Sequence, residues 1–136
     1  MRLAALMMGI VANLPMFAAA QWSVELQPSG TQAVLPELGG RATLVVRCFW
    51  DRAEPVLLLH QPVSGPHQPV IYRFDDDDAK WVAAAVSQEG HLLHIWNDDE
   101  KQRFARAKRL RIQLRPFTVF DFDLSGSETI ASTIRC

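Results

Sequence analysis

Two histidines stand close together in the chain, and histidine is the commonest protein ligand for transition metals. His91 and His94 are separated by two residues. On a helix this spacing would place both imidazoles on one face, where they could bind one zinc ion. The segment 91–96 instead predicts a strand, on which positions i and i+3 point to opposite faces. We therefore expect no metal site at these residues.

Acidic residues offer two further kinds of chemistry. Residues 75–78 are all aspartates, but the run lacks the alternating ligands and the glycine of a calcium loop, and a solvated turn is the alternative. Glu54, Glu89, Asp121 and Asp123 are carboxylates that a hydrolase could pair across a substrate. The sequence has no Gly-x-Ser-x-Gly elbow and no glycine-rich phosphate loop. We therefore expect no enzyme activity and no cofactor.

The chain has exactly two cysteines, Cys48 and Cys136. In an exported chain they have one intramolecular pairing available, so we expect a Cys48–Cys136 disulfide. Neither cysteine belongs to a Cys-x-x-Cys motif, which argues against a redox-active pair. The bridge would close a loop of nearly the whole domain, for which the chain-entropy model gives roughly 4 to 5 kcal/mol. It would fasten the C-terminus to the sheet.

The most localised charge feature is an arginine stripe, made of Arg103, Arg106, Arg109, Arg111 and Arg115. The last three alternate with apolar residues and so share one face of a predicted strand, while the first two lie on the helix predicted before it. Guanidinium groups bind carboxylates and phosphates, which makes the stripe a candidate site for an anionic partner. The competing interpretation is an edge strand that its charges protect from aggregation.

These residues must be positioned by a domain that follows a predicted secretory signal peptide. Arg2 precedes an apolar stretch over residues 3–14, and Pro15 and the alanines at 18–20 follow. The stretch is shorter than the about 20 residues that cross a bilayer as a helix. We expect cleavage after Ala20, a mature domain of residues 21–136, a periplasmic or secreted location and no stable membrane anchor.

Residues 21–136 suit one domain of mostly β structure. The clearest period-2 alternation covers residues 109–115, where Leu110, Ile112 and Leu114 share the side that packs on the core. The expected strands are 22–27, 42–50, 56–59, 70–74, 80–87, 91–96, 109–115 and 117–124, with a proline-containing loop over 61–69.

Two capping boxes predict short helices. Asn97 stands three residues before Glu100, and Ser125 stands three residues before Glu128. The expected helices are 98–107 and 125–136. The predicted fold is therefore mainly β, a β-sandwich-like single domain with one inserted and one C-terminal short helix.

The overall charge excludes one class of partner. The chain has 14 Lys and Arg against 15 Asp and Glu, a formal net charge of −1. This balance gives no general attraction to nucleic acid or to an anionic membrane. An electrostatic partner must therefore be recognised by a local patch.

Four segments in order resemble the periplasmic proteins associated with type VI secretion, the VasI/TagO group. They are LVVRC at 44–48, VIYRFD at 70–75, LRIQL at 110–114, and FDLSG at 122–126 running to Cys136. The resemblance covers about residues 22–136 and implies an exported accessory protein of β-rich fold in which Cys48 and Cys136 match the bridging cysteines. It implies no catalytic residues. A similar C-terminal pattern occurs in invasion-associated locus B-like proteins.

Together, these observations predict a non-enzymatic periplasmic accessory or binding protein with a periplasmic protein partner. Type VI secretion is the system that the resemblance suggests. An alternative from a different class is a periplasmic inhibitor or immunity protein that blocks a cell-envelope enzyme. A hydrolase built from the four carboxylates named above is the third hypothesis.

Overall fold

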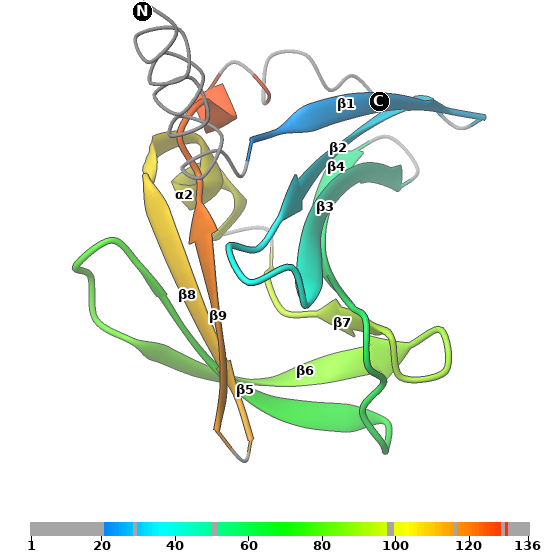
Figure 1. The fold of residues 1–136 in the computed structure, drawn as a ribbon, viewed down its shortest axis with the longest axis vertical. Coiled ribbons are helices and arrows are strands. Elements are labelled where there is room, and N and C mark those ends of the chain that lie inside the picture. The colour runs from blue at the N-terminus through cyan, green and yellow to red at the C-terminus, as the bar shows by residue number, and fades with distance from the viewer. Residues whose placement is uncertain are drawn as a thin grey trace, which may run out of the picture.

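Strands dominate the part of the chain that the structure describes (Figure 1). The computed structural model describes residues 21–28, 30–49, 52–97, 100–115, 117–128 and 130. The predicted leader, residues 1–20, lies outside them. The described elements are β1 (Ser23–Gln27), β2 (Gly30–Pro36), β3 (Ala42–Phe49), β4 (Arg52–Leu59), β5 (His67–Phe74), β6 (Lys80–Ser87), β7 (Leu92–His94), α2 (Lys101–Arg106), β8 (Arg109–Leu114) and β9 (Thr118–Asp123).

The strands form one sheet in the order β1-β2-β3-β4-β7-β6-β5-β8-β9, and all neighbours pair antiparallel. In Figure 1 the strands β1 to β4 lie on one side of the molecule, and β5, β6, β8 and β9 face them. The mainly β prediction is confirmed. The two facing layers belong to one continuous sheet that curves around its core.

The turn between β2 and β3 brings the two layers together at β9. Leu38 donates its backbone N–H to the carbonyl oxygen of Asp121 at 3.0 Å. Arg41 donates from Nη2 to the carbonyl oxygen of Val119 at 2.5 Å, and its guanidinium lies 5.2 Å from the ring centre of Phe120. Glu37 fixes that guanidinium with a hydrogen bond of 3.0 Å from Arg41 Nε. Part of the β9 edge is therefore covered by this turn.

Strand β8 shows how alternation separates the inner and outer faces of the sheet. Leu110, Ile112 and Leu114 are at most 4% exposed and belong to the core cluster. Arg109 and Arg111 point outward and are exposed. The inner face of every strand from β2 to β9 contributes to the same core cluster. Burial of this apolar surface is the main force that keeps the sheet curved.

The connection between the two layers runs through β7, which is shorter than the predicted strand 91–96. β7 contains three residues, and it pairs with β4 through Leu92 and Leu93. It pairs with β6 through the same two leucines and His94. Because few ladder bonds join the layers here, side-chain contacts across β7 matter more than at longer strands.

Both capping predictions are wrong in detail. Helix α2 has Glu100, not Asn97, at its N-cap, without a side-chain hydrogen bond to the cap. The Glu100 carboxylate is turned toward Lys80 instead. At the second site, the Ser125 hydroxyl donates to Asp123 Oδ1 at 2.6 Å rather than capping a helix. Residues 127, 128 and 130 are helical, and residues 131–136 of the predicted terminal helix lie outside the described residues.

Two strands were misjudged because turn-forming residues interrupt their pattern. β2 was not predicted, although Ala33 and Leu35 alternate inward and are fully buried. β5 begins at His67, inside the predicted loop, and contains Pro69. The ladder from β5 to β8 begins at Val70, so Pro69 takes part only in the pair with β6. A proline at such a position leaves the β5–β8 ladder intact.

Candidate binding surface

The outer face of β5, β8 and β9 is built in rows set by the strand register. Arg73 on β5 stands opposite Arg111 on β8, which stands opposite Asp121 on β9. Two residues before Arg111 on β8, Arg109 stands opposite Asp123. Alternation in each strand puts all of these side chains on the face away from the core. We call these five residues, Arg73, Arg109, Arg111, Asp121 and Asp123, the charged rows.

The best-defined contact in the charged rows joins Arg111 to Asp121. Arg111 Nε donates to Asp121 Oδ1 at 2.8 Å, and Nη2 lies 3.5 Å from Oδ2. The hydrogen bond and the charge of the Asp121 carboxylate raise the pKa of Arg111. The pair is open to solvent, where ion pairs contribute little to stability. Its main consequence is that the positive charge of Arg111 is already matched.

The aspartate run forms one corner of the same surface. Asp75 Oδ1 accepts hydrogen bonds from the backbone N–H groups of Lys108 and Arg109 at 3.0 and 2.9 Å. Asp76 Oδ1 lies 3.9 Å from Arg109 Nη2. Asp77 pairs with Arg103 of α2. The run is therefore a turn that fastens the start of β8 rather than a solvated turn alone.

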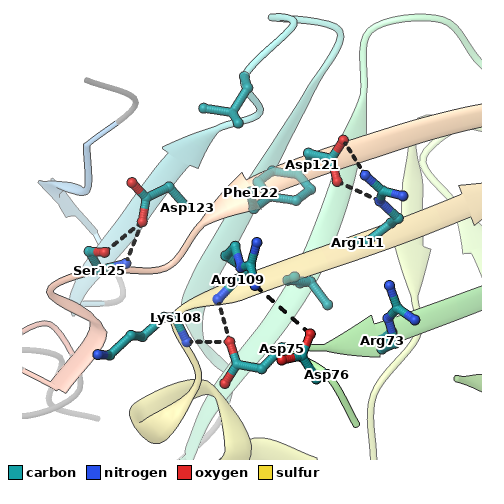
Figure 2. A pocket seen from close by; sticks show the side chains of 12 residues that line it. Arg73, Asp75, Asp76, Lys108, Arg109, Arg111, Asp121, Phe122, Asp123 and Ser125 are labelled. Atoms are coloured by element: carbon teal, nitrogen blue, oxygen red, sulfur yellow. Dashed lines mark hydrogen bonds and ion pairs between the residues drawn. The ribbon is translucent and has the colours of Figure 1, made fainter. Parts of the chain in front are cut away.

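Figure 2 shows the concavity that these residues line, with Arg111 pointing toward Asp121 and Arg109 toward Asp76. Its volume is about 600 Å³. Its charged lining consists of Arg73, Lys108, Arg109 and Arg111 with Asp75, Asp76, Asp121 and Asp123. Four cations face four anions, so the surface carries no net positive charge. Arg73 has no ion pair or side-chain hydrogen bond within the described residues, although it stands next to Arg111.

The outer face becomes apolar toward the other end of β8. Ile71 stands opposite Trp81 on one side and Gln113 on the other. Trp81 is 65% exposed, and Phe117, in the turn after β8, is 86% exposed. We call Ile71, Trp81 and Phe117 the apolar cluster. They line a second concavity of about 470 Å³ that also includes Arg115.

The arginine stripe is divided by the structure. Arg103 lies on α2, where it pairs with Asp77 and its guanidinium lies 5.5 Å from the ring centre of Phe74. Arg106 is exposed on the same helix. Arg109 and Arg111 lie in the charged rows, and Arg115 lies beside the apolar cluster. The five arginines therefore do not form one continuous basic surface.

A buried polar cluster holds α2 against the sheet. Glu100 is 7% exposed, pairs with Lys80, and has Arg103 Nη1 3.7 Å from its Oε2. The pKa of Tyr72 is raised to about 12, mainly by burial and then by the charge of Glu100 and its hydrogen bond with Tyr72. Aromatic rings surround the cluster, with Trp96 and Phe104 centred 4.9 Å apart. This part of the stripe thus supports the fold.

The two histidines have different partners. His91 lies in the turn before β7, and its Nδ1 is 2.8 Å from the carbonyl oxygen of Leu59. His94 Nδ1 is 3.0 Å from Glu54 Oε1, and its Nε2 is 3.0 Å from Ser87 Oγ. No group of three metal-ligating side chains occurs among the described residues. No sequence motif could have revealed the contact of Ser87, because the three residues lie on separate strands.

The predicted disulfide cannot be placed as a pair. Cys48 lies on β3, with its Sγ 3.8 Å from the carbonyl oxygen of Thr31. Cys136 lies outside the described residues. The Cys48–Cys136 bridge stays a prediction.

Comparisons with known proteins add no relative. The chain matches no family model, no curated protein and no solved structure. Among the described residues, no helix is long and apolar enough to cross a membrane.

Proposed function

We propose that this chain is an exported binding protein that docks a periplasmic protein on the outer face of β5, β6 and β8. The observation that carries the proposal is the apolar cluster next to the charged rows. Large apolar side chains are rarely grouped on a solvent-exposed surface, and where they are, the patch commonly marks an interaction site. An apolar centre beside polar residues is the ordinary composition of a protein–protein interface.

The chemistry of the surface indicates which side chains would contribute most to binding. Trp and Arg are over-represented among residues whose truncation weakens an interface strongly. Trp81 and Arg115 both line the concavity of the apolar cluster. The charged rows would fix orientation, because their charges are already matched and add little net attraction. Arg115 lines the concavity of the apolar cluster, and Arg109 and Arg111 lie in the charged rows farther along β8, so all three remain in the proposed partner surface.

Alanine substitutions test the proposal. Trp81→Ala and Phe117→Ala should each weaken co-purification of the partner with the exported, tagged chain at least tenfold, since a buried aromatic anchor contributes roughly 2 kcal/mol or more. Leu26→Ala on β1 is the matched control, because Leu26 is as exposed as Phe117 at 86%. Equal loss from all three variants, or loss from Leu26→Ala alone, would contradict the proposed surface.

The proposed export rests on the predicted signal peptide, and the proposed link to type VI secretion rests on the resemblance to the VasI/TagO group. An intact mass that begins at Gln21 and lacks two hydrogen atoms would support export and the Cys48–Cys136 bridge. A partner from the type VI secretion apparatus would support the accessory role. A cell-envelope hydrolase as partner would favour the inhibitor instead, and its activity with and without the chain would decide between the two.

A further inference from the structure

A serine, a histidine and a glutamate form a hydrogen-bonded chain on the outer face of the sheet, where the short strand β7 joins β4 to β6. Ser87 ends β6, His94 ends β7, and Glu54 lies on β4. His94 is joined to the other two by the 3.0 Å contacts described above. The side chains of His94 and Glu54 are 31% and 20% exposed. The three groups are thus fixed by neighbouring strands but remain open to solvent.

The partners determine how the imidazole is protonated. A carboxylate only accepts hydrogen bonds, so His94 Nδ1 must carry the hydrogen that faces Glu54. In the neutral ring, Nε2 then has a free lone pair, and the Ser87 hydroxyl donates to it. This is the arrangement in which a histidine acts as the base for a serine nucleophile and a carboxylate orients the ring.

The turn after Ser87 supplies backbone donors in a fixed conformation. Gln88 and Glu89 have φ of 51° and 57°, the left-handed region that few side chains favour. Gly90 follows with φ of 92°, and a Cβ there would lie 2.2 Å from the carbonyl oxygen of Val63. Within the described part of the chain, the N–H groups of Gln88, Glu89 and Gly90 donate to no carbonyl oxygen. Backbone N–H groups next to a nucleophile can stabilise an oxyanion.

We propose that Ser87 is a catalytic nucleophile that cleaves acyl esters, with His94 as general base and Glu54 as its orienting residue. Ser87 Oγ forms a bond to the acyl carbon, and the bond from that carbon to the leaving oxygen breaks. The Ser87 proton passes to His94 Nε2 and then to the leaving oxygen. Water then attacks the acyl carbon, the bond from that carbon to Ser87 Oγ breaks, and the proton of the water passes through His94 to Ser87 Oγ as the acid is released.

This activity goes beyond the proposed binding function and departs from the non-enzymatic expectation. The competing interpretation is structural: the chain of hydrogen bonds could serve only to fasten β4, β7 and β6 to one another. The two interpretations differ in a measurable way. A fastening role predicts changed stability on substitution and an ordinary, unreactive hydroxyl, whereas a nucleophile reacts with electrophiles in the folded protein.

The direct test is covalent labelling of the mature wild-type protein with a fluorophosphonate probe. The expected result is one adduct per chain, located on Ser87 by peptide mass. Ser64 is exposed in the loop before β5 and serves as the internal comparison. No adduct on Ser87, or equal labelling of Ser64 and Ser87, would overturn the proposal.

Hydrolysis of p-nitrophenyl acetate gives the second readout. Ser87→Ala and His94→Gln should each lower the rate roughly 100-fold or more, the usual contribution of such a base. Glu54→Gln should lower it less and should also lower probe labelling. Ser64→Ala and His60→Gln, both at exposed positions, control for hydrolysis by surface groups. Unchanged hydrolysis in Ser87→Ala, with or without a shift in its melting temperature, would leave only the fastening role.

Discussion

The two ends of the arginine stripe show how the same residue type does different work. On α2, Arg103 lies near the buried Glu100, pairs with Asp77 and packs against Phe74. On the outer face of β8, Arg111 pairs with an exposed partner, Asp121. The two arginines differ in burial. An ion pair in a poorly hydrated site is strong, but an unpaired charge there is costly, whereas an ion pair in water is weak. A sequence run of arginines therefore need not be one functional surface.

Substitution at the buried end should give the largest effect on stability. Glu100→Gln keeps the size of the side chain but leaves Lys80 and Arg103 without their shared negative charge. We expect a loss of roughly 2 to 4 kcal/mol in the free energy of unfolding, measured in urea. Glu128→Gln is the control, because Glu128 is exposed and should change the free energy by less than about 0.5 kcal/mol. Equal effects would remove the distinction between the two ends.

The alkaline limit of stability sharpens the same comparison. The folded pKa of Tyr72 is about 12, against 10.0 for an ordinary tyrosine. The unfolded chain therefore loses this proton first, and stability that is full below pH 10 falls as pH rises toward 12. The expected loss is roughly 2 to 3 kcal/mol. Tyr72→Phe should lack this part of the fall in urea unfolding across that range.

Tyr72 is also the single tyrosine of the chain, so its ionisation can be followed directly by ultraviolet absorbance. Titration of the folded protein should give a midpoint well above that of the urea-unfolded chain. A midpoint near 10 in the folded protein would show that Tyr72 is neither buried nor close to Glu100.

The exposed end should give the smallest effect. Arg111→Ala removes the contact with Asp121, but Arg73 and Asp121 on either side remain in water. The free energy of unfolding should therefore change by less than about 0.5 kcal/mol. The melting temperature should also respond little to salt. A loss above about 1.5 kcal/mol would mean that the charged rows support the fold as the Glu100 cluster does.

Much of the fold could be predicted because alternation is a local property. The inward set of β8, Leu110, Ile112 and Leu114, follows from residues next to one another in sequence, and the structure confirms it. The pairing of Arg111 with Asp121 depends on the register of β8 with β9, which local pattern does not determine. The contact of Ser87 with His94 and Glu54 requires three strands to be neighbours, and no single segment carries that information.

The helices show a limit of a different kind. The capping-box spacing at Asn97 and Glu100 predicted a helix there, and α2 is present nearby. Its start was misplaced because Glu100 makes a tertiary contact with Lys80 that replaces the local one. The apolar cluster was missed for a similar reason. Trp81 stands opposite Ile71 across the β5–β6 ladder, and both side chains are exposed, a neighbourhood that no single segment of sequence carries.

Site-specific photocrosslinking tests the central claim most directly. A photoreactive amino acid at position 81 or 117 of the exported chain lies within the apolar cluster, and the same residue at position 26 lies on β1, where the native side chain is as exposed as that of Phe117. The proposed surface predicts crosslinks from 81 and 117 to the same periplasmic protein and none from 26. No crosslink from 81 and 117, or the same crosslinks from all three positions, would contradict it.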